Sequence, residues 1–293
     1  MSAPDPSPDP GVVTYPPDRH LLRDLPFEME AVDPASSRGH LRVTPELCVD
    51  GHLSAGPLMT VIDVLAGSLV GRVLAPDWMA TAQLSLHLDD PPGQGSVTAE
   101  GSVVRAGRTT VVVEVVLTSH DAGAADRQFG EALLTFVRLP RRDTTMDLSA
   151  FEIRYGERTS FALAASGFRE PFDRSIGAEV RAASSGTVRV KVHPYIRNSF
   201  GAVNGGVVAS VADVAARGLA GGLQGRPVRT SDVVVHYLTQ GRVGPLSTVA
   251  RSVRSGPAGT LVRVEVRDDG DPEPDGSPRV MVVAHVQCVA GGS

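Results

Sequence analysis

Two aspartates, Asp63 and Asp213, lie 150 positions apart (213 − 63), and the residues around them recur in the same order. A glycine-rich stretch ends seven positions before each aspartate, at residues 51–56 (GHLSAG) in the first half and at residues 201–206 (GAVNGG) in the second. A period of this length indicates two whole domains, because the repeats of solenoid proteins span only tens of residues. The chain is therefore expected to contain one domain twice.

The length and composition fit this arrangement. The 293 residues suit two domains of ordinary size, and 42% hydrophobic residues are enough to bury a core in each. A net charge of −5 and an aromatic content of 4% argue against a nucleic-acid surface, which needs basic residues and stacking aromatics. Cys48 and Cys288 are too few for a disulfide framework and show no metal-ligand spacing. We therefore expect a reducing compartment, the cytoplasm, and no nucleic-acid partner.

The N-terminal residues show no targeting signal. Residues 1–10 are rich in proline and aspartate and contain no apolar run, so they resemble neither a signal peptide nor an anchor. We expect a disordered tail over residues 1–20. Elsewhere, no stretch is expected to supply the roughly 20 apolar residues that a membrane span requires, which predicts no membrane partner.

Each half shows the same order of expected elements. Two strands come first, one long apolar helix follows over residues 55–74 or 205–222, and three or four strands complete the half. This order lacks the strand–helix alternation of parallel sheets. It predicts an α+β fold in which each of two tandem domains wraps an antiparallel sheet around one central helix. The expected strands are 26–32, 39–43, 96–104, 109–118 and 132–139, then 176–181, 187–192, 246–253, 260–267 and 280–289; residues 85–88 (SLHL) and 235–238 (VHYL) also match at the spacing of 150.

The domain boundaries follow from these elements. The first domain is expected over residues 21–142 and the second over residues 173–293, with a linker over residues 143–172. Within the linker, residues 161–164 (FALA) can form a short helix that covers the second domain. Residues 268–278 are rich in glycine, proline and aspartate, which indicates a solvated loop.

The start of the second long helix has the chemistry of an oxyanion site. Gly205 and Gly206 open this helix, whose first backbone N–H groups lack partners and carry partial positive charge. Asp213 follows Gly205 by eight residues (213 − 205), so it lies roughly 12 Å further along the helix and is too far to serve the same carbonyl. If the two long helices run antiparallel about a pseudo-twofold axis, each aspartate approaches the glycine-rich start of the other helix.

One half of the chain carries a recognisable motif, and the other carries a degraded copy of it. The second half contains Asn198, Gly201, Gly205, Gly206, Asp213, Thr230 and Asp232. This set resembles the hotdog-fold thioesterases of the phenylacetate-pathway (PaaI) type, although Asn204 stands where that family usually has histidine. The resemblance implies a double-hotdog chain whose halves form an intramolecular pseudo-dimer. The first half keeps Gly51, Gly56 and Asp63 but has Cys48 near the asparagine position, Ser54 for the histidine, Ala55 for the first paired glycine, and Ala80 beside Thr81 at the hydroxyl position.

In this family each site takes residues from two subunits, which the resemblance transfers to the two halves of the chain. Site one would combine Asp63 and Thr81 with Asn198, Asn204, Gly205 and Gly206, and site two would combine Asp213 and Thr230 with Cys48, Ser54, Ala55 and Gly56. Site one keeps the better carbonyl cradle, so we expect it to be the active one. The residues expected to be catalytic are Asp63, Asp213, Asn198 and Thr230, and those expected to contact substrate are Asn204, Gly205, Gly206, Ser54, Gly56, Thr81 and Arg108.

The expected activity is the hydrolysis of an acyl-CoA, or a related acyl thioester, to a free acid and a thiol. Asp63 would act as general base on water or attack the thioester directly, and the sequence leaves both routes open. Coenzyme A is part of the substrate, and no other cofactor and no metal are expected. Arg108, in a hairpin, could contact the coenzyme A phosphates. The acyl group is not specified by the sequence, and a homodimer of the whole chain is compatible with it.

Other interpretations of the same residues remain open. A helical aspartate can cap a loop or pair with an arginine, a Gly-Gly pair can serve close helix packing, and hairpin arginines usually face solvent. At the level of function, the alternatives are a hotdog enoyl-thioester hydratase or dehydratase and a non-catalytic acyl-thioester binding protein. Hydratases of this fold use an aspartate with a histidine, and no histidine follows either helical aspartate at a short interval.

Overall fold

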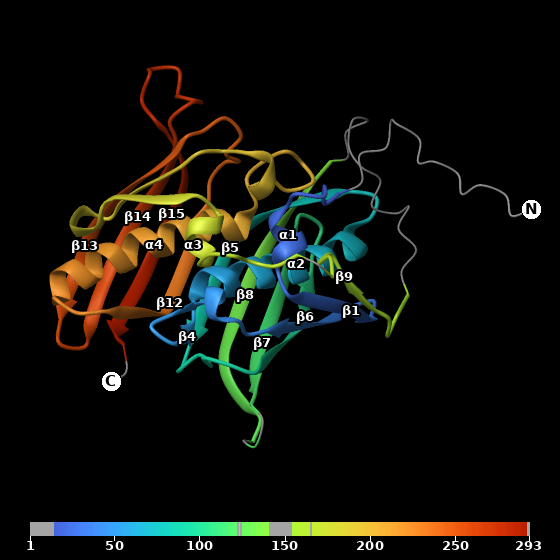
Figure 1. Cartoon of the computed structure of the whole chain (residues 1–293). Helices are drawn as coiled ribbons and strands as arrows, with labels where there is room; N and C mark the ends of the chain where they lie inside the picture. Colours follow the sequence, from blue (N-terminus) through green and yellow to red (C-terminus); the bar gives the residue numbers. More distant parts are fainter. Residues whose placement is uncertain (1–14, 122, 124, 141–153, 165, 292–293) are drawn as a thin grey trace, which may run out of the picture.

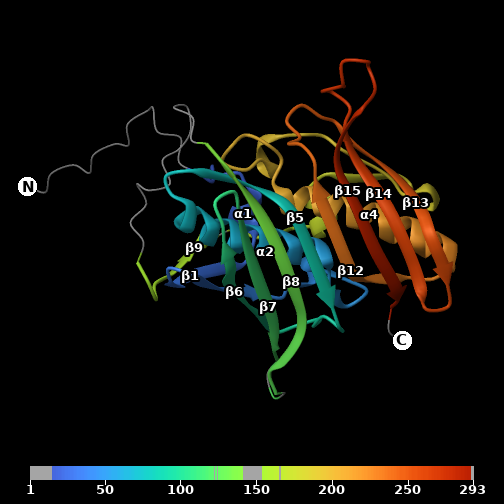
Figure 2. The same ribbon diagram turned by 180° about the vertical axis from the view of Figure 1, so that it is seen from behind.

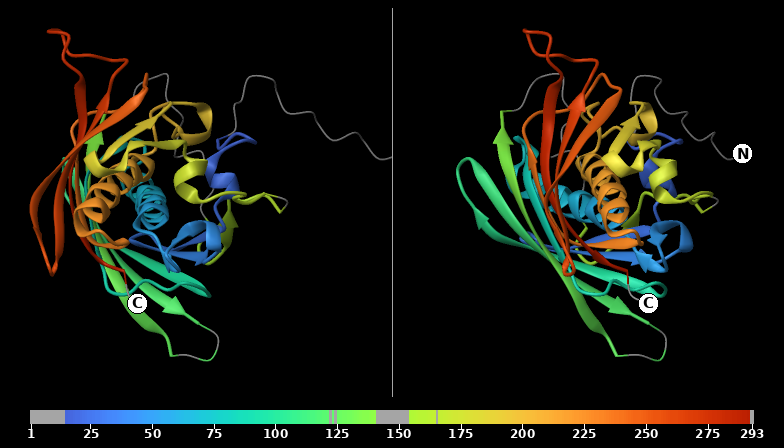
Figure 3. Two further views of the ribbon diagram at one scale, coloured as in Figure 1. Left: turned by 60° about the vertical axis from the view of Figure 1, so that its left-hand side comes forward. Right: turned by 90° about the vertical axis from the view of Figure 1, so that its left-hand side faces the viewer.

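The computed structural model describes residues 15–121, 123, 125–140, 154–164 and 166–291. Its main feature is a 13-stranded sheet in which each pair of neighbouring strands is antiparallel (Figure 1). Two long helices, α2 (Ala55–Leu74) and α4 (Gly205–Gln224), lie together on one face of this sheet, as the end-on views show (Figure 3). The expected α+β fold of two tandem hotdog domains is therefore confirmed.

The strand order has the symmetry expected of a duplicated chain. The order is β10-β11-β13-β14-β15-β12 followed by β5-β8-β7-β6-β2-β1-β9, so that the two halves meet at β12 and β5. The first half contains α1 (Leu21–Asp24), β1 (Phe27–Asp33), β2 (Ser36–Arg42), β3 (Cys48–Val49), β4 (His52–Leu53), α2, β5 (Trp78–Leu88), β6 (Ser96–Ala106), β7 (Thr110–His120) and β8 (Arg127–Leu139). The second half contains α3 (Phe172–Ser175), β10 (Ala178–Ala182), β11 (Thr187–Val190), α4, β12 (Val228–Tyr237), β13 (Leu246–Gly256), β14 (Gly259–Asp268) and β15 (Arg279–Ala290), and β9 (Arg158–Ser160) lies between the halves.

The two long helices contact each other through their N-terminal turns and run antiparallel there. Gly56, at the start of α2, packs against Ser210 of α4, and Gly206, at the start of α4, packs against Thr60 of α2. A side chain at Gly206 would place its Cβ 2.3 Å from the Cα of Thr60, so only glycine fits at this crossing. The close approach brings each helix start to the middle of the other helix. This is the antiparallel arrangement that the composite sites require.

The two halves of the sheet are joined by main-chain pairing between β5 and β12 (Figure 2). Both strands carry a one-residue bulge: Ala82 follows Thr81 in β5, and Ser231 follows Thr230 in β12. The bulges lie 149 positions apart (231 − 82), so the spacing of 150 that holds in the helices shortens by one in these strands. The matching of residues 85–88 with 235–238 was therefore wrong by one residue, and the structural counterpart of Thr81 is Thr230.

The central helices also correct the expectation about membrane-length segments. Both α2 and α4 have 20 residues, with mean hydropathies of 1.6 and 1.3, and by length and composition each is long and apolar enough to cross a bilayer. In the fold, 67% and 72% of their most apolar windows are buried against the rest of the protein. The apolar runs thus belong to the core helices, which pack into the curved sheet.

The segment between the halves packs on the first half of the chain. Strand β9 pairs with β1 and extends the sheet edge. Residues 161–164, which we expected as a helix over the second domain, are not helical, and the Leu163 N–H donates to the Arg23 carbonyl. Of the expected tail, residues 15–20 are placed: His20 is buried and its Nε2 is 2.7 Å from the Arg197 carbonyl. Residues 1–14 and 141–153 lie outside the described residues.

Candidate active site

The structure brings Asp63 of α2 to the start of α4. The Asp63 carboxylate accepts a hydrogen bond from Thr81 Oγ1 at 2.7 Å and from the Gly206 N–H at 3.3 Å. A Cβ on Gly205 would lie 2.9 Å from Asp63 Oδ2, so the absence of a side chain at Gly205 lets the carboxylate approach the helix start. Site one therefore joins four of its predicted residues: Asp63, Thr81, Gly205 and Gly206.

Two tyrosines complete the surroundings of Asp63. Tyr237, at the end of β12, donates its hydroxyl to the Gly205 carbonyl at 3.0 Å. Tyr15, in the segment before α1, donates to the Arg197 carbonyl at 3.4 Å. Burial and the negative charge of Asp63 raise the pKa of both phenols, so both remain protonated near neutral pH.

Burial also raises the pKa of Asp63 itself, and the hydrogen bonds from Thr81 and Gly206 only partly offset this effect. Among the described residues, none of the lysines, arginines or histidines forms an ion pair with Asp63. A partly desolvated carboxylate without a cation is a stronger base than an exposed one. Its environment therefore suits proton abstraction from water or nucleophilic attack.

The two asparagines of site one shape the backbone that leads into α4. Asn204 is the N-cap of α4, and its buried side chain accepts a hydrogen bond from the Val207 N–H at 3.3 Å. Asn198 Oδ1 accepts from the N–H groups of Phe200 and Ala202 at 3.0 and 3.1 Å. In the described part of the chain, no hydrogen bond joins Asn198 to Asp63. The predicted catalytic role of Asn198 and the substrate contact of Asn204 remain predictions.

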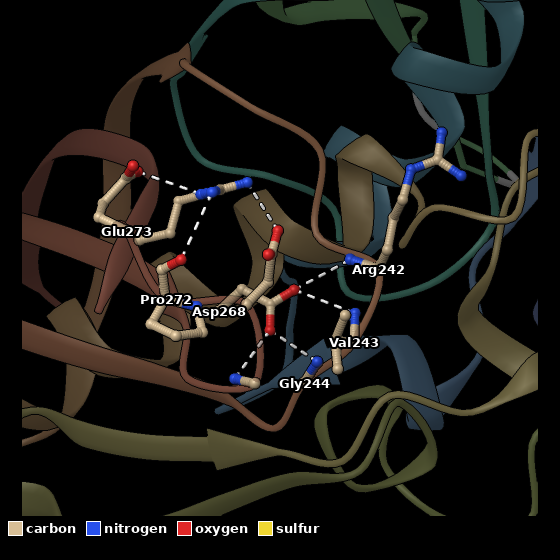
Figure 4. Close-up of polar contacts among 9 residues, drawn as sticks. Arg242, Val243, Gly244, Asp268, Pro272 and Glu273 are labelled. Carbon is tan, nitrogen blue, oxygen red and sulfur yellow. Dashed lines mark hydrogen bonds and ion pairs between the residues drawn. The ribbon is translucent and has the colours of Figure 1, made fainter. Parts of the chain in front are cut away.

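The buried carboxylate of Asp268 supports the segment that leads into α4 (Figure 4). Asp268, at the end of β14, accepts hydrogen bonds from the N–H groups of Arg242, Val243, Gly244 and Gly270. The braced segment in turn holds the loop before α4, since the Gly241 carbonyl accepts from the Val203 N–H at 2.9 Å and Arg242 Nη1 donates to the Phe200 carbonyl at 2.9 Å.

Asp268 was expected in a solvated loop, but it is 1% exposed. Burial alone would raise its pKa, but the backbone N–H groups outweigh that effect and lower the pKa below the ordinary value for aspartate. The carboxylate of Asp268 is therefore a structural anion rather than part of a loop in solvent.

At site two the corresponding aspartate, Asp213, forms an ion pair with an arginine. Asp213 is fully buried in α4 and accepts a hydrogen bond from Thr230 Oγ1 at 2.5 Å, which matches the contact between Thr81 and Asp63. Arg217, one turn later, donates to Asp213 at 2.8 Å and to Asp173 of α3 at 2.8 Å. Although burial lowers the pKa of Arg217, the two carboxylates raise it above its ordinary value. The guanidinium thus turns Asp213 into part of a buried ion-pair network.

Arg217 also lies beside the start of α2, where site two was predicted to bind the substrate carbonyl. It lines a cavity of only about 20 Å³ together with Ser54, Ala55 and Thr230. Ser54 is the N-cap of α2 but makes no side-chain capping bond, and Gly56 is in contact with Ser210, as expected for close helix packing. A space of this size holds about one water molecule. Of the residues predicted for site two, Thr230 contacts Asp213 and lines this cavity with Ser54 and Ala55. Cys48 instead donates to the Gly93 carbonyl at 3.7 Å.

Arg108 lies apart from both aspartates. It is exposed at the turn between β6 and β7, and no hydrogen bond joins it to either aspartate in the described residues. The pairing registers place the neighbouring Ala106 in one cross-strand row with Val111, Phe136 and Thr81. Three strand spacings correspond to roughly 14 Å. The predicted contact between Arg108 and substrate remains a prediction.

Sequence reasoning missed Arg217 and Tyr237, as well as Tyr15 and Asp173. Arg217 follows Asp213 by four positions on one helix, which is the spacing of a helical ion pair, and Gly67 occupies the matching position after Asp63. That signal was available in the sequence. Tyr237 gave no such signal, because its contact with Gly205 joins a strand end to a helix start 32 positions away.

Comparisons with known proteins agree with this geometry. A family model described as the thioesterase superfamily matches residues 50–124 and 200–274, the same part of each repeat. No curated protein sequence matches significantly. An acyl-ACP thioesterase from Bacteroides thetaiotaomicron is similar in structure with a TM-score of 0.54 and 15% identity, over 86% of this chain and 97% of that one.

Two further solved structures share the whole architecture. The tesB protein of Mycobacterium avium subs paratuberculosis has a TM-score of 0.57 at 12% identity and covers 90% of this chain and 96% of its own. The 12:0-ACP thioesterase of Umbellularia californica has a TM-score of 0.55 at 10% identity and covers 86% of this chain and 93% of its own. At such identities these likenesses establish the fold. The family model matches both repeats, and the chain thus belongs to the thioesterase superfamily as a tandem hotdog protein.

Proposed function

We propose that the protein hydrolyses an acyl thioester, with acyl-CoA as the substrate, at site one only. The observation that carries this proposal is the partly buried Asp63 carboxylate, which contacts no cation among the described residues and lies 3.3 Å from the Gly206 N–H at the start of a 20-residue helix. A base or nucleophile and a set of oxyanion donors thus lie side by side. The resemblance of the second-half motif to PaaI-type thioesterases supports the choice of acyl-CoA over other thioesters.

The reaction follows from these groups. The thioester carbonyl binds at the start of α4, where the backbone N–H groups stabilise the negative charge that develops on its oxygen. Without substrate, the Gly206 N–H donates to Asp63 and the Val207 N–H donates to Asn204. In the proposed reaction the carbonyl oxygen takes over the Gly206 N–H, whose bond to Asp63 is at the long end of the hydrogen-bond range. Asp63 removes a proton from water as the water oxygen attacks the carbonyl carbon. The carbon–sulfur bond then breaks, and the departing thiolate takes up a proton.

Direct attack by Asp63 is the second route, and it would give a mixed anhydride that water then hydrolyses. A single turnover in water labelled with oxygen-18 can identify this second route. In the general-base route the label enters the free acid and does not enter Asp63. In the nucleophilic route, water that attacks the Asp63 carbonyl of the anhydride leaves the label in the Asp63 carboxylate and an unlabelled Asp63 oxygen in the free acid. Water that attacks the acyl carbon instead labels the free acid, as in the general-base route, so label found in Asp63 is the result that identifies the nucleophilic route.

Thiol release measured over a panel of acyl-CoA esters tests the proposed function. We expect turnover by the wild type and loss of turnover with Asp63→Asn. An acyl-carrier-protein panel run in parallel tests whether coenzyme A is the carrier. Tight binding of acyl-CoA with no thiol release across both panels would show that the protein is a binding protein and would overturn the proposal.

The hydratase alternative is tested by product analysis on crotonyl-CoA. Hydration leaves the thiol bound, whereas hydrolysis releases it. In the described part of the chain neither Asp63 nor Asp213 is hydrogen-bonded to a histidine, and this arrangement supports hydrolysis over hydration.

A further inference from the structure

We propose that Tyr237 is a positioning residue for the reaction, acting on Asp63 through the single peptide group that joins Gly205 to Gly206. This inference rests on the proposed function of site one. It concerns a residue outside the predicted set, contributed by β12 rather than by either long helix.

The geometry of one peptide group carries the inference. The carbonyl of this group belongs to Gly205 and accepts the Tyr237 hydroxyl at 3.0 Å, and its N–H belongs to Gly206 and donates to Asp63 Oδ2 at 3.3 Å. The donor is unambiguous, because a carbonyl oxygen can only accept. Since a peptide group is planar, a bond that fixes its oxygen also fixes the direction of its N–H. Tyr237 and Asp63 therefore hold opposite ends of one rigid unit.

The residues of this peptide explain why such a restraint is needed. Gly205 and Gly206 lack side chains for reasons of space, since a Cβ at Gly205 would lie 2.9 Å from Asp63 and a Cβ at Gly206 would lie 2.3 Å from Thr60. Because glycine has more backbone freedom than other residues, two successive glycines make this first turn of α4 less rigid at the point where the N–H groups must face a substrate carbonyl. The Tyr237 hydroxyl supplies the restraint that a side chain at these positions cannot.

The same bond has an electrostatic effect on the site. A hydrogen bond to the carbonyl polarises the peptide and strengthens its N–H as a donor, by about 10 to 30% in condensed phases. The groups facing Asp63 are Thr81 from β5, Gly206 from α4, and the phenols of Tyr15 and Tyr237, which are neutral near neutral pH. Removing the Tyr237 hydroxyl weakens one of the two hydrogen bonds that stabilise the Asp63 carboxylate.

Among the described residues, site two has no equivalent of the hydrogen bond from the Tyr237 hydroxyl to the helix start. With the spacing of 149 that holds in these strands, the counterpart of Tyr237 is Leu88, whose side chain has no hydroxyl. In the part of the chain that the structure describes, no side-chain hydroxyl donates to the Ala55 carbonyl, which is the counterpart of the Gly205 carbonyl at the helix spacing of 150. The tyrosine is thus present only where the aspartate lacks a cation.

Tyr237→Phe tests the proposal, because it removes the hydroxyl and keeps the ring. We expect kcat to fall about tenfold from the loss of orientation, with KM changed by less than about twofold. We also expect the acid limb of the pH–rate profile to move to higher pH, because a less stabilised Asp63 carboxylate takes up its proton more readily. A role in packing alone would lower stability without moving this limb.

Tyr195→Phe is the matched control. It removes a different tyrosine hydrogen bond, the one that donates to Asp24 at 2.8 Å, and Asp63 is not its partner. We expect it to leave the pH–rate limb in place, even if it lowers the melting temperature. Thermal unfolding of both variants establishes that each is folded at the assay temperature.

Titration of the Asp63 carboxyl by carbon-13 NMR, assigned by comparison with Asp63→Asn, gives a readout that does not need turnover. If the wild type releases thiol but Tyr237→Phe matches it in kcat, in the acid limb and in the Asp63 titration, the positioning role is wrong and the proposed function stands. If the wild type shows no turnover, the proposed function fails. In that case an upward shift of the Asp63 titration in Tyr237→Phe still supports the coupling, and an unchanged titration overturns it.

Discussion

Asp63 and Asp213 occupy matching positions on matching helices, yet their surroundings give the two carboxylates different properties. Each aspartate accepts a hydrogen bond from a threonine hydroxyl of the adjoining strand. Asp213 also binds Arg217, whereas the position matching Arg217 in the first half is Gly67, which has no side chain. The residue one helical turn after each aspartate therefore decides whether the carboxylate forms a buried ion pair with an arginine. The comparison shows how a duplicated site can keep its framework in both copies and its chemistry in one.

The largest expected effect is on turnover. Asp63→Asn should lower kcat by about 10³-fold, because it removes the base or nucleophile of site one. Asp213→Asn should leave the rate per folded molecule within about threefold of the wild type. Thiol release at saturating acyl-CoA measures both. Loss of activity in Asp213→Asn alone would reverse the assignment of the working site.

The second effect separates the same two variants by stability. Asp213→Asn breaks the buried network with Arg217 and Asp173 and should lower the free energy of unfolding by about 3 kcal/mol. Asp63→Asn should instead raise it, by about 1 kcal/mol at pH 7. Urea unfolding of the two variants, followed by circular dichroism, checks this difference.

The sign for Asp63 follows from its pKa, which burial raises above the value in the unfolded chain. Ionising this carboxyl in the folded protein therefore costs free energy, and the cost appears as the pH rises through the raised pKa. The stability gained by Asp63→Asn should shrink at acid pH, where both states of the wild type are protonated. An equal gain at all pH values would contradict this explanation.

A third variant tests the framework that supports site one but not site two. Asp268→Asn should lower the free energy of unfolding by about 2 kcal/mol, because four backbone N–H groups lose a charged acceptor. The wild-type contribution of Asp268 is complete above the ordinary pKa of aspartate and is lost as the pH falls through the lowered folded value. The wild type and Asp268→Asn should therefore converge in stability toward low pH, as measured by urea unfolding at a series of pH values.

The smallest expected effect concerns the two arginine-bearing hairpins. Ala106, next to the turn that holds Arg108, shares a cross-strand row with Thr81, and Ser255, next to Arg254, shares the equivalent row with Thr230. If only site one works, Arg108→Ala should raise KM for acyl-CoA about threefold at low salt, through loss of a phosphate contact. Arg254→Ala removes an arginine from the other hairpin and should leave KM unchanged. Equal effects of the two variants would indicate a general charge effect instead.

Several features of the site could be predicted from the sequence because they depend on local spacing. The glycines and the aspartate seven residues later recur in both halves, and the length of the helix rules out a site within one half. Those two facts predict that each aspartate meets the glycine-rich start of the other helix, and the contact between Asp63 and Gly206 confirms this for Asp63. The helix over residues 55–74 was predicted with the bounds that the structure shows.

Other features could not be predicted, because they depend on residues far apart in the chain. Asp268 lies in a run rich in glycine, proline and aspartate, and only the loop folded against it supplies the N–H groups that allow its burial. Residues 161–164 have the composition of a short helix, but main-chain bonding to the segment around Arg23 gives them an irregular conformation. The bulges beside Thr81 and Thr230 shift the strand spacing to 149, which an ungapped comparison of the halves does not reveal.

The sequence by itself determined the duplication, the order of the elements and the need for two halves to build one site, because these depend on periodicity and on the rise of a helix per residue. Only the tertiary structure decided which of the two aspartates forms an ion pair with an arginine and which groups orient the start of α4. Those outcomes depend on which side chains of α2, α4 and the sheet contact one another. A contact between residues far apart in the chain produces no recurring pattern in the sequence, so the sequence alone does not predict it.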